Sequence, residues 1–228
     1  MWSDREAERD LLNYSSYVTV ISDICTHDDL APLTLGIFGS WGSGKTSLMK
    51  MLKRSIDDAT ASNRSKTLWF NAWRYEGREE AQSALIHAVL GKLAEDKTLA
   101  QDAKDVFDRL KNGASVLKLA KFIGKTTMTM TPDLGGFIDC FKEESEKIAD
   151  TMERFDKDFA SLLERAKIKR IVVFIDDLDR CSSAKVIETF ETIKLFLNTP
   201  ECTFVIGADQ DKIEQAVGEV YGVPQAQK

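Results

Sequence analysis

One short stretch near the N-terminus constrains the fold of this chain more than any other feature. Residues 39 to 46 read Gly-Ser-Trp-Gly-Ser-Gly-Lys-Thr and fit the pattern G-x-x-x-x-G-K-[ST]. An apolar segment, Leu33 to Phe38, precedes this stretch, and an amphipathic segment, Ser47 to Ile56, follows it. Glycines let the backbone curl so that successive N–H groups face one anionic centre, and the following helix adds its positive end. The pattern therefore predicts a strand, a phosphate-binding loop and a helix, in that order.

The phosphate loop, residues Gly39 to Thr46, predicts a nucleoside triphosphate as the ligand, and we expect ATP. Lys45 is expected to place its charge between the β- and γ-phosphates, and the Thr46 hydroxyl to bind Mg²⁺. The other expected nucleotide-binding residues are Gly39, Ser40, Trp41, Gly42, Ser43, Gly44 and Ser47.

A second motif supplies the acidic groups that a phosphate loop lacks. The apolar run Ile171 to Ile175 is rich in β-branched residues, which is typical of a strand buried on both faces in a parallel sheet. Asp176 and Asp177 follow at its C-terminal end, where ligands of open α/β sheets collect. We expect Asp176 to hold Mg²⁺ together with Thr46, and Asp177 to polarise the attacking water.

Composition limits which other classes of protein this chain fits. A chain of 228 residues forms one good core, and no cluster of Pro, Gly and Ser divides it, so we expect one domain over residues 1–228. Its four cysteines lie far apart, which argues against a disulfide framework or a zinc site and favours the cytoplasm. No stretch reaches the roughly 18 apolar residues of a membrane span. A formal charge of -6 gives no direct signal for nucleic-acid binding.

Hydrophobic periodicity predicts the remaining elements, which alternate between helix and strand. The expected helices cover residues 4–26, 79–93, 141–162, 184–197 and 210–220, and the further strands cover 67–73 and 202–208. Residues 112–136 mix basic positions, Thr-Met alternation, Pro132 and two glycines, and we interpret them as an irregular insertion.

Three residues at the predicted ligand edge each allow two interpretations. Asp209 follows the strand 202–208, where it either senses the γ-phosphate or caps the next helix. Trp73 either touches nucleotide or a neighbouring subunit or, as is commoner for large aromatic side chains, joins the core. Arg180 either acts on a neighbouring subunit's phosphate or, as we favour, pairs with Asp177 or Asp179.

Four blocks of the sequence together resemble the KAP family of P-loop NTPases. They are residues 39–46, Trp-Phe-Asn-Ala-Trp-Arg-Tyr at 69–75, Phe-Ile-Asp-Asp-Leu-Asp-Arg-Cys at 174–181 and Val-Ile-Gly-Ala-Asp at 205–209. The resemblance implies a three-layer α/β fold with a mainly parallel sheet of strand order 5-1-4-3-2, related to the signal-transduction ATPases. It also implies that ATP works as a switch or assembly trigger, with phage exclusion and membrane scaffolding among the roles of the family.

The sequence departs from the family pattern in two places. Many members carry transmembrane helices between the two nucleotide motifs, where this chain has only the stretch 112–136. Nothing after Asp209 reads as a fifth strand or a helical lid. We therefore expect strand five and the lid to be missing, the strand Leu33 to Phe38 to lie at an exposed sheet edge, and that edge to be completed by further sequence, a second chain or self-association.

The leading hypothesis from the sequence is a slow, Mg²⁺-dependent ATPase that acts as a nucleotide switch or assembly ATPase, with a protein partner or a second copy. In it, Lys45, Asp177 and Asp209 serve catalysis, and Thr46 and Asp176 hold the metal. Two alternatives stay open. One is a nucleotide-gated interaction scaffold with little turnover, and the other is a P-loop kinase, which the tandem carboxylates and the absence of an Arg-rich lid disfavour.

Overall fold

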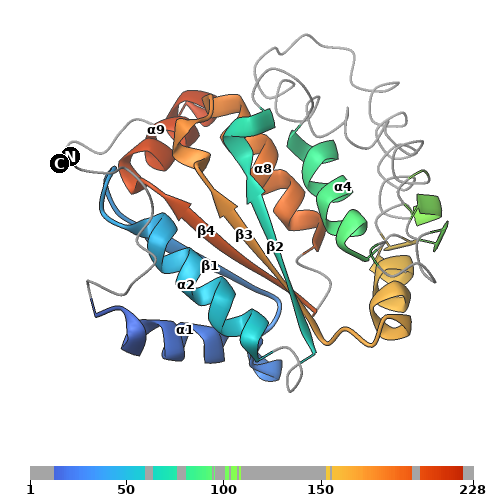
Figure 1. Cartoon of the computed structure of the whole chain (residues 1–228). Coiled ribbons are helices and arrows are strands. Elements are labelled where there is room, and N and C mark those ends of the chain that lie inside the picture. The colour runs from blue at the N-terminus through green and yellow to red at the C-terminus, as the bar shows by residue number, and fades with distance from the viewer. Residues whose placement is uncertain are drawn as a thin grey trace, which may run out of the picture.

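A parallel four-stranded sheet organises the chain (Figure 1). The computed structural model describes residues 13–59, 64–75, 81–93, 95, 101–102, 104–106, 108, 153–154, 156–196 and 201–222. The strands are β1 (Leu33–Phe38), β2 (Ser65–Asn71), β3 (Arg170–Asp176) and β4 (Cys202–Ala208). Their order in the sheet is β1-β4-β3-β2, and every pairing is parallel. The predicted order of strands one to four is thus confirmed.

Helices cover both faces of this sheet and give three layers (Figure 1). Two helices lie on one face, α1 (Ser15–Thr26) and α2 (Lys45–Asp58), and α4 (Ala81–Leu93), α8 (Ser183–Phe196) and α9 (Gln210–Tyr221) lie on the other. Side chains of β3 alternate between the two cores: Val172 and Phe174 pack with α1 and α2, and Ile171, Val173 and Ile175 pack with the other helices. Because both faces are covered, β3 and β4 are buried at every position, which explains their apolar sequences.

The predicted end of the second strand was wrong. β2 ends at Asn71, and the chain then forms a 3-10 turn from Ala72 to Tyr75. Asn71 Oδ1 accepts the backbone N–H of Arg74 at 3.2 Å, so a local side-chain bond replaces the next ladder bond. Trp73 consequently lies on the outside with 52% of its surface exposed, and its predicted place in the core was also wrong.

The predicted helix over residues 4–26 is not continuous, because Asn13 has a left-handed backbone with φ of 55° and α1 begins at Ser15. The other predicted helices and strands agree with the described elements, apart from small shifts at their ends. Residues 156–165 are helical, as expected for the C-terminal part of the long helix 141–162. The predictions for residues 4–12, 112–136 and 141–152 fall outside the described residues.

β1 lies at one edge of the sheet. Within the described residues it pairs with β4 alone, with Gly36 opposite Ile206. Its residues alternate in exposure, and Phe38 at its end is 56% exposed. The Phe38 ring occupies the space beside Gly36, where an added Cβ would come within 2.6 Å of it. The described fold therefore places the first strand where the sequence analysis expected it, at an edge.

Candidate nucleotide-binding site

The phosphate loop connects β1 to the N-terminus of α2 at the C-terminal edge of the sheet. Gly39 N–H donates to the Ala208 carbonyl at 3.2 Å, which fixes the start of the loop against the end of β4. Gly42 and Gly44 have φ values of 78° and 89°, in the left-handed region that glycine adopts without steric cost. Gly44 is also the residue that precedes α2, a helix of 14 residues. The loop therefore curls at a helix N-terminus, where unpaired N–H groups attract an anion.

Lys45 folds back over this loop. Its Nζ donates to the Gly39 carbonyl at 2.8 Å and to the Ser40 carbonyl at 3.1 Å. The ammonium group is thereby held across the mouth of the loop. Tyr14 adds a contact that the sequence analysis missed, because its hydroxyl donates to the Ser43 carbonyl at 3.2 Å and no motif signals this.

Thr46 and Asp176 bring the two nucleotide motifs together across 130 residues of sequence. The Thr46 Oγ1 atom lies 3.0 Å from Asp176 Oδ2 and 3.3 Å from Asp176 Oδ1. Asp176 is only 4% exposed, and this burial raises the pKa of its carboxyl, as does the nearby charge of Asp177. A hydroxyl and a buried carboxylate are oxygen ligands of the kind that Mg²⁺ prefers, and a cation offsets the cost of ionising that carboxylate, so these residues fit the metal.

Asp177 takes a different direction from its neighbour. Its backbone is left-handed, with φ of 58°, which is uncommon for a residue other than glycine. Asn71 Nδ2 donates to Asp177 Oδ2 at 2.7 Å, and Arg180 Nε lies 2.8 Å from Asp177 Oδ1. The pairing of Arg180 that we favoured is thus present. Asn71 was missed as a site residue; its position at the end of a strand, on the ligand edge and next to Asp176 in register, is the signal that points to it.

Asp209 lies at the C-terminal end of β4 and caps α9. Its carboxylate accepts the N–H of Asp211 at 3.1 Å. The cap is therefore present, and the γ-phosphate role stays a prediction.

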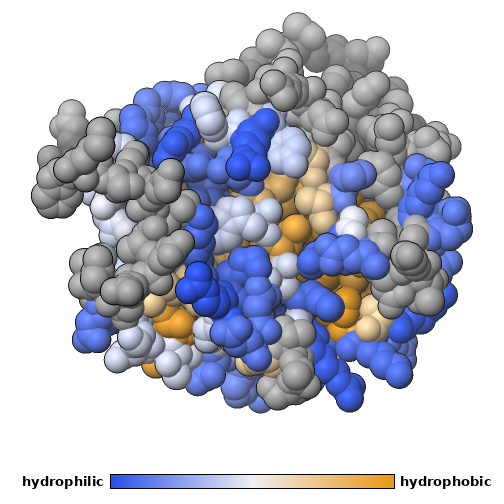
Figure 2. Space-filling view, in the orientation of Figure 1, coloured by the Kyte–Doolittle hydropathy of each residue, from blue (hydrophilic) through white to orange (hydrophobic). Residues whose placement is uncertain are grey.

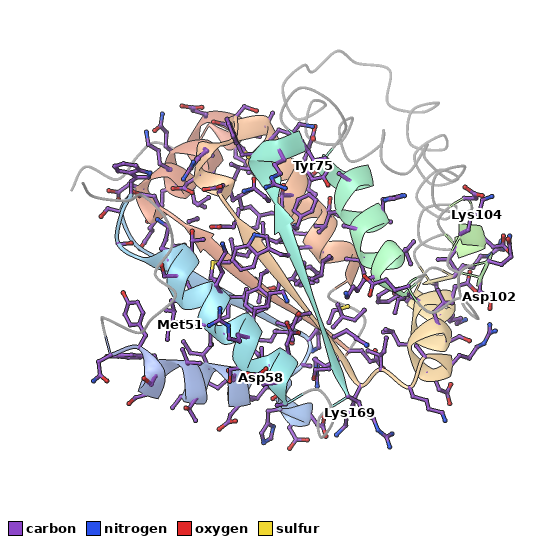
Figure 3. All side chains as sticks on the ribbon, in the orientation of Figure 1. Met51, Asp58, Tyr75, Asp102, Lys104 and Lys169 are labelled. Atoms are coloured by element: carbon purple, nitrogen blue, oxygen red, sulfur yellow. The ribbon has the colours of Figure 1, made fainter. Side chains whose placement is uncertain are left out.

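A cavity of about 1160 Å³ connects these groups. It begins at the phosphate loop, includes both carboxylates and Asn71, and continues beside α2 as far as Asp58. Figure 3 shows Asp58 at the C-terminal end of α2 and Tyr75 beside the C-terminal end of β2, and both residues line the cavity. In Figure 2, hydrophilic side chains cover α2, and hydrophobic ones are visible between α2 and α4.

Comparison with known proteins identifies the family. A model described as the KAP family P-loop domain matches residues 13–228. The chain belongs to the KAP family. Among curated proteins, the phage T7 exclusion protein of Escherichia coli (strain K12) is 26% identical to this KAP domain over 199 residues, which are 80% of this chain and 26% of the relative. The chain therefore spans about a quarter of the length of that relative.

Among solved structures, the Aeropyrum pernix ORC2 protein (ADPNP-ADP complexes) matches 97% of this KAP domain and 48% of its own chain, with 12% identity and a TM-score of 0.45. Within the described residues of the KAP domain, no helix has both the length and the apolar character needed to cross a bilayer.

Proposed function

We propose that this KAP domain binds ATP with Mg²⁺ and hydrolyses it slowly, as a nucleotide switch or an assembly ATPase. The contact between Thr46 and Asp176, 3.0 Å at its shortest, carries the proposal because it joins the phosphate loop to the acidic motif at one place. Two oxygen ligands beside a phosphate-binding loop are what a Mg²⁺-nucleotide requires.

In the proposed mechanism, the loop N–H groups and the N-terminus of α2 bind the phosphates. Lys45 exchanges its two carbonyl partners for the β- and γ-phosphate oxygens, and Thr46 and Asp176 hold Mg²⁺. When bound, Mg²⁺ neutralises charge on the phosphates. Asp209 reports the presence of the γ-phosphate from the end of β4.

Asp177 orients the attacking water. The water oxygen forms a bond to the γ-phosphorus while the bond to the β–γ bridging oxygen breaks, and ADP leaves with that electron pair. The proton of the water passes to the Asp177 carboxylate, from which it returns to phosphate or solvent. Positioning and electrostatics supply most of the rate in such reactions.

A role in defence against phage is the biological setting that we propose. It is supported by the relative whose name is phage T7 exclusion protein, which matches 80% of this chain. Expression of the wild-type protein should lower the plating efficiency of a susceptible phage, and Lys45→Ala should restore it. Equal protection by the two proteins contradicts a nucleotide-dependent defence role.

A binding measurement tests the nucleotide site. Lys45→Ala should abolish detectable ATP binding by calorimetry, because the charge that faces the phosphates is lost. The circular dichroism spectrum should stay unchanged, since Lys45 does not belong to the hydrophobic core on either face of the sheet. Lys66→Ala is the matched control, because this exposed lysine of β2 does not line the cavity. Retention of micromolar affinity in Lys45→Ala would contradict the assignment of the loop.

A nucleotide-gated interaction module is the second candidate. Its support is the exposure of two large aromatic residues near the site, Trp41 at 74% and Trp73 at 52%, which suits a surface that contacts a partner. Mixing radiolabelled ATP with an excess of the protein, and following the label over time, separates the two candidates. A module retains intact ATP in the complex for hours, whereas an ATPase converts it to ADP.

A further inference from the structure

The carboxylate of Asp177 is engaged at both of its oxygens by groups outside the phosphate loop. We propose that Asn71 and Arg180 hold Asp177 in a resting position, so that the rate of hydrolysis is set by release of this carboxylate. We call the three residues the Asp177 latch. The proposal rests on the proposed function, in which Asp177 orients the attacking water.

Asn71 provides the first side of the latch. It is the last residue of β2, opposite Asp176 in the parallel register between β2 and β3. Its amide makes two bonds of opposite kind: Nδ2 donates to Asp177 Oδ2 at 2.7 Å, and Oδ1 accepts the N–H of Arg74 at 3.2 Å. A flipped amide would set oxygen against the carboxylate and NH₂ against the backbone N–H, so the two partners fix its orientation. Asn71 is therefore a positioning residue for Asp177.

Arg180 provides the second side. Its Nε lies 2.8 Å from Asp177 Oδ1, and it belongs to the 3-10 turn Leu178–Arg180 directly after the carboxylate. The Arg180 side chain is 50% exposed, whereas that of Asp177 is 18% exposed. Arg180 is thus the more accessible partner in the latch.

The latch leaves the water-orienting step incomplete. Each oxygen of Asp177 accepts one bond and keeps a second lone pair, so the two bonds do not saturate the carboxylate; they hold it turned toward Asn71 and Arg180. A water at the γ-phosphate therefore competes with the Asn71 amide and the Arg180 guanidinium for the orientation of this carboxylate. Removal of either competitor lets the carboxylate turn toward the water and should accelerate hydrolysis without changing the groups that bind the phosphates.

Asn71 also connects the latch to an exposed turn. The N–H that its Oδ1 accepts belongs to Arg74, in the 3-10 turn Ala72–Tyr75 that presents Trp73 at the surface. Arg74 and Arg180 both line the cavity that holds the phosphate loop. A contact that moves this turn therefore moves the Asn71 side chain, and with it the bond to Asp177.

The test compares ATP affinity and single-turnover rate at saturating ATP and Mg²⁺. Asn71→Ala removes both bonds of the amide, and Arg180→Ala removes the guanidinium that pairs with Asp177. Both variants should raise the single-turnover rate by about three- to tenfold with affinity unchanged within about twofold. Asp177→Asn added to any of them should return the rate to that of Asp177→Asn alone. Lys66→Ala should behave as the wild type.

The possible results separate the latch from the proposed function. A rate that depends on Lys45 but is unchanged or lower in the Asn71 and Arg180 variants overturns the latch and leaves the ATPase standing. Phosphate release that does not depend on Lys45 overturns the proposed function, and the latch with it. If Asn71→Ala fails to fold, Arg180→Ala decides the matter by itself, because its side chain is half exposed.

Discussion

Asp176 and Asp177 are adjacent in sequence, yet their surroundings give them different chemistry. Asp176 is 4% exposed, and the Thr46 hydroxyl is its side-chain partner. Asp177 has a left-handed backbone and faces Asn71 and Arg180. In the proposed function, the first carboxylate binds a cation beside the phosphate loop, and the second orients a water that approaches the γ-phosphate.

Replacing each carboxylate by its amide should separate the two roles. Asp176→Asn should weaken Mg²⁺-dependent ATP binding and turnover together, because the metal loses a charged ligand. Asp177→Asn should keep ATP bound and slow hydrolysis by roughly a hundredfold or more, as expected for loss of a general base. Calorimetry with Mg²⁺ or with a chelator, combined with single-turnover kinetics, measures both effects. Equal losses of affinity in the two variants contradict this division.

Two cysteines should be inert in the folded protein. Burial raises the pKa of the Cys25 thiol to about 12 and raises that of Cys202 as well, and their exposures are 1% and 0%. A raised thiol pKa means that the protonated form persists at neutral pH, whereas the thiolate is the nucleophile. Iodoacetamide should leave both residues unmodified until the protein is unfolded in urea, as mass spectrometry of their peptides will report. Fast labelling of either in the native state contradicts their burial.

At the scale of elements, local signals predicted most of the fold and tertiary contacts decided the rest. The apolar runs of β3 and β4 and the motif between β1 and α2 predicted those elements, because burial on both faces and phosphate binding impose those residue types. Arg180 was predicted to pair with Asp177 or Asp179, both close to it in sequence, and the partner is Asp177. The contact of Asn71 with Asp177 depends on the register of two strands that are 106 residues apart in sequence, which periodicity does not encode. Exposure of Trp73 follows from the same residue, since Asn71 ends β2 early.

Packing between β4 and α2 depends on a missing side chain at Gly207. A Cβ there would overlap Met49 Sδ, and Met49 is fully buried in the core that supports the phosphate loop. Gly207→Ala should therefore destabilise the protein by about 1–3 kcal/mol and lower its Tm. Gly91→Ala on α4 is the matched control: its Cβ meets nothing within 4 Å, and alanine should stabilise that helix by up to about 1 kcal/mol. A fall in Tm of the same size in both variants would contradict the packing explanation.

At the scale of the whole molecule, the edge of the sheet at β1 is the feature that bears most on assembly. Within the described residues, β1 pairs with β4 alone, and Phe38 beside the phosphate loop is 56% exposed. An edge strand offers a row of backbone donors and acceptors to another strand. A second copy of the chain, or further sequence, that covers this edge would act directly on the loop that binds the phosphates.

Self-association through this edge should make turnover depend on concentration. We expect the specific ATPase activity to rise with protein concentration over the range in which sedimentation shows a change from monomer to a larger species. Thr34→Pro, which places a proline in the edge strand β1, should lower both the association and the rise. A protein that stays monomeric, with constant specific activity across that range, would contradict self-association through β1.

The most direct test of the central claim is the release of phosphate from ATP by the wild-type protein and by Lys45→Ala, each with Mg²⁺ and with a chelator. The claim is that the phosphate loop and the carboxylates at the end of β3 form one Mg²⁺-dependent site for ATP hydrolysis. We predict slow release by the wild type that requires Mg²⁺ and disappears in Lys45→Ala, while Lys66→Ala keeps the wild-type rate. Release that persists in Lys45→Ala, or that is the same with and without Mg²⁺, would contradict the account.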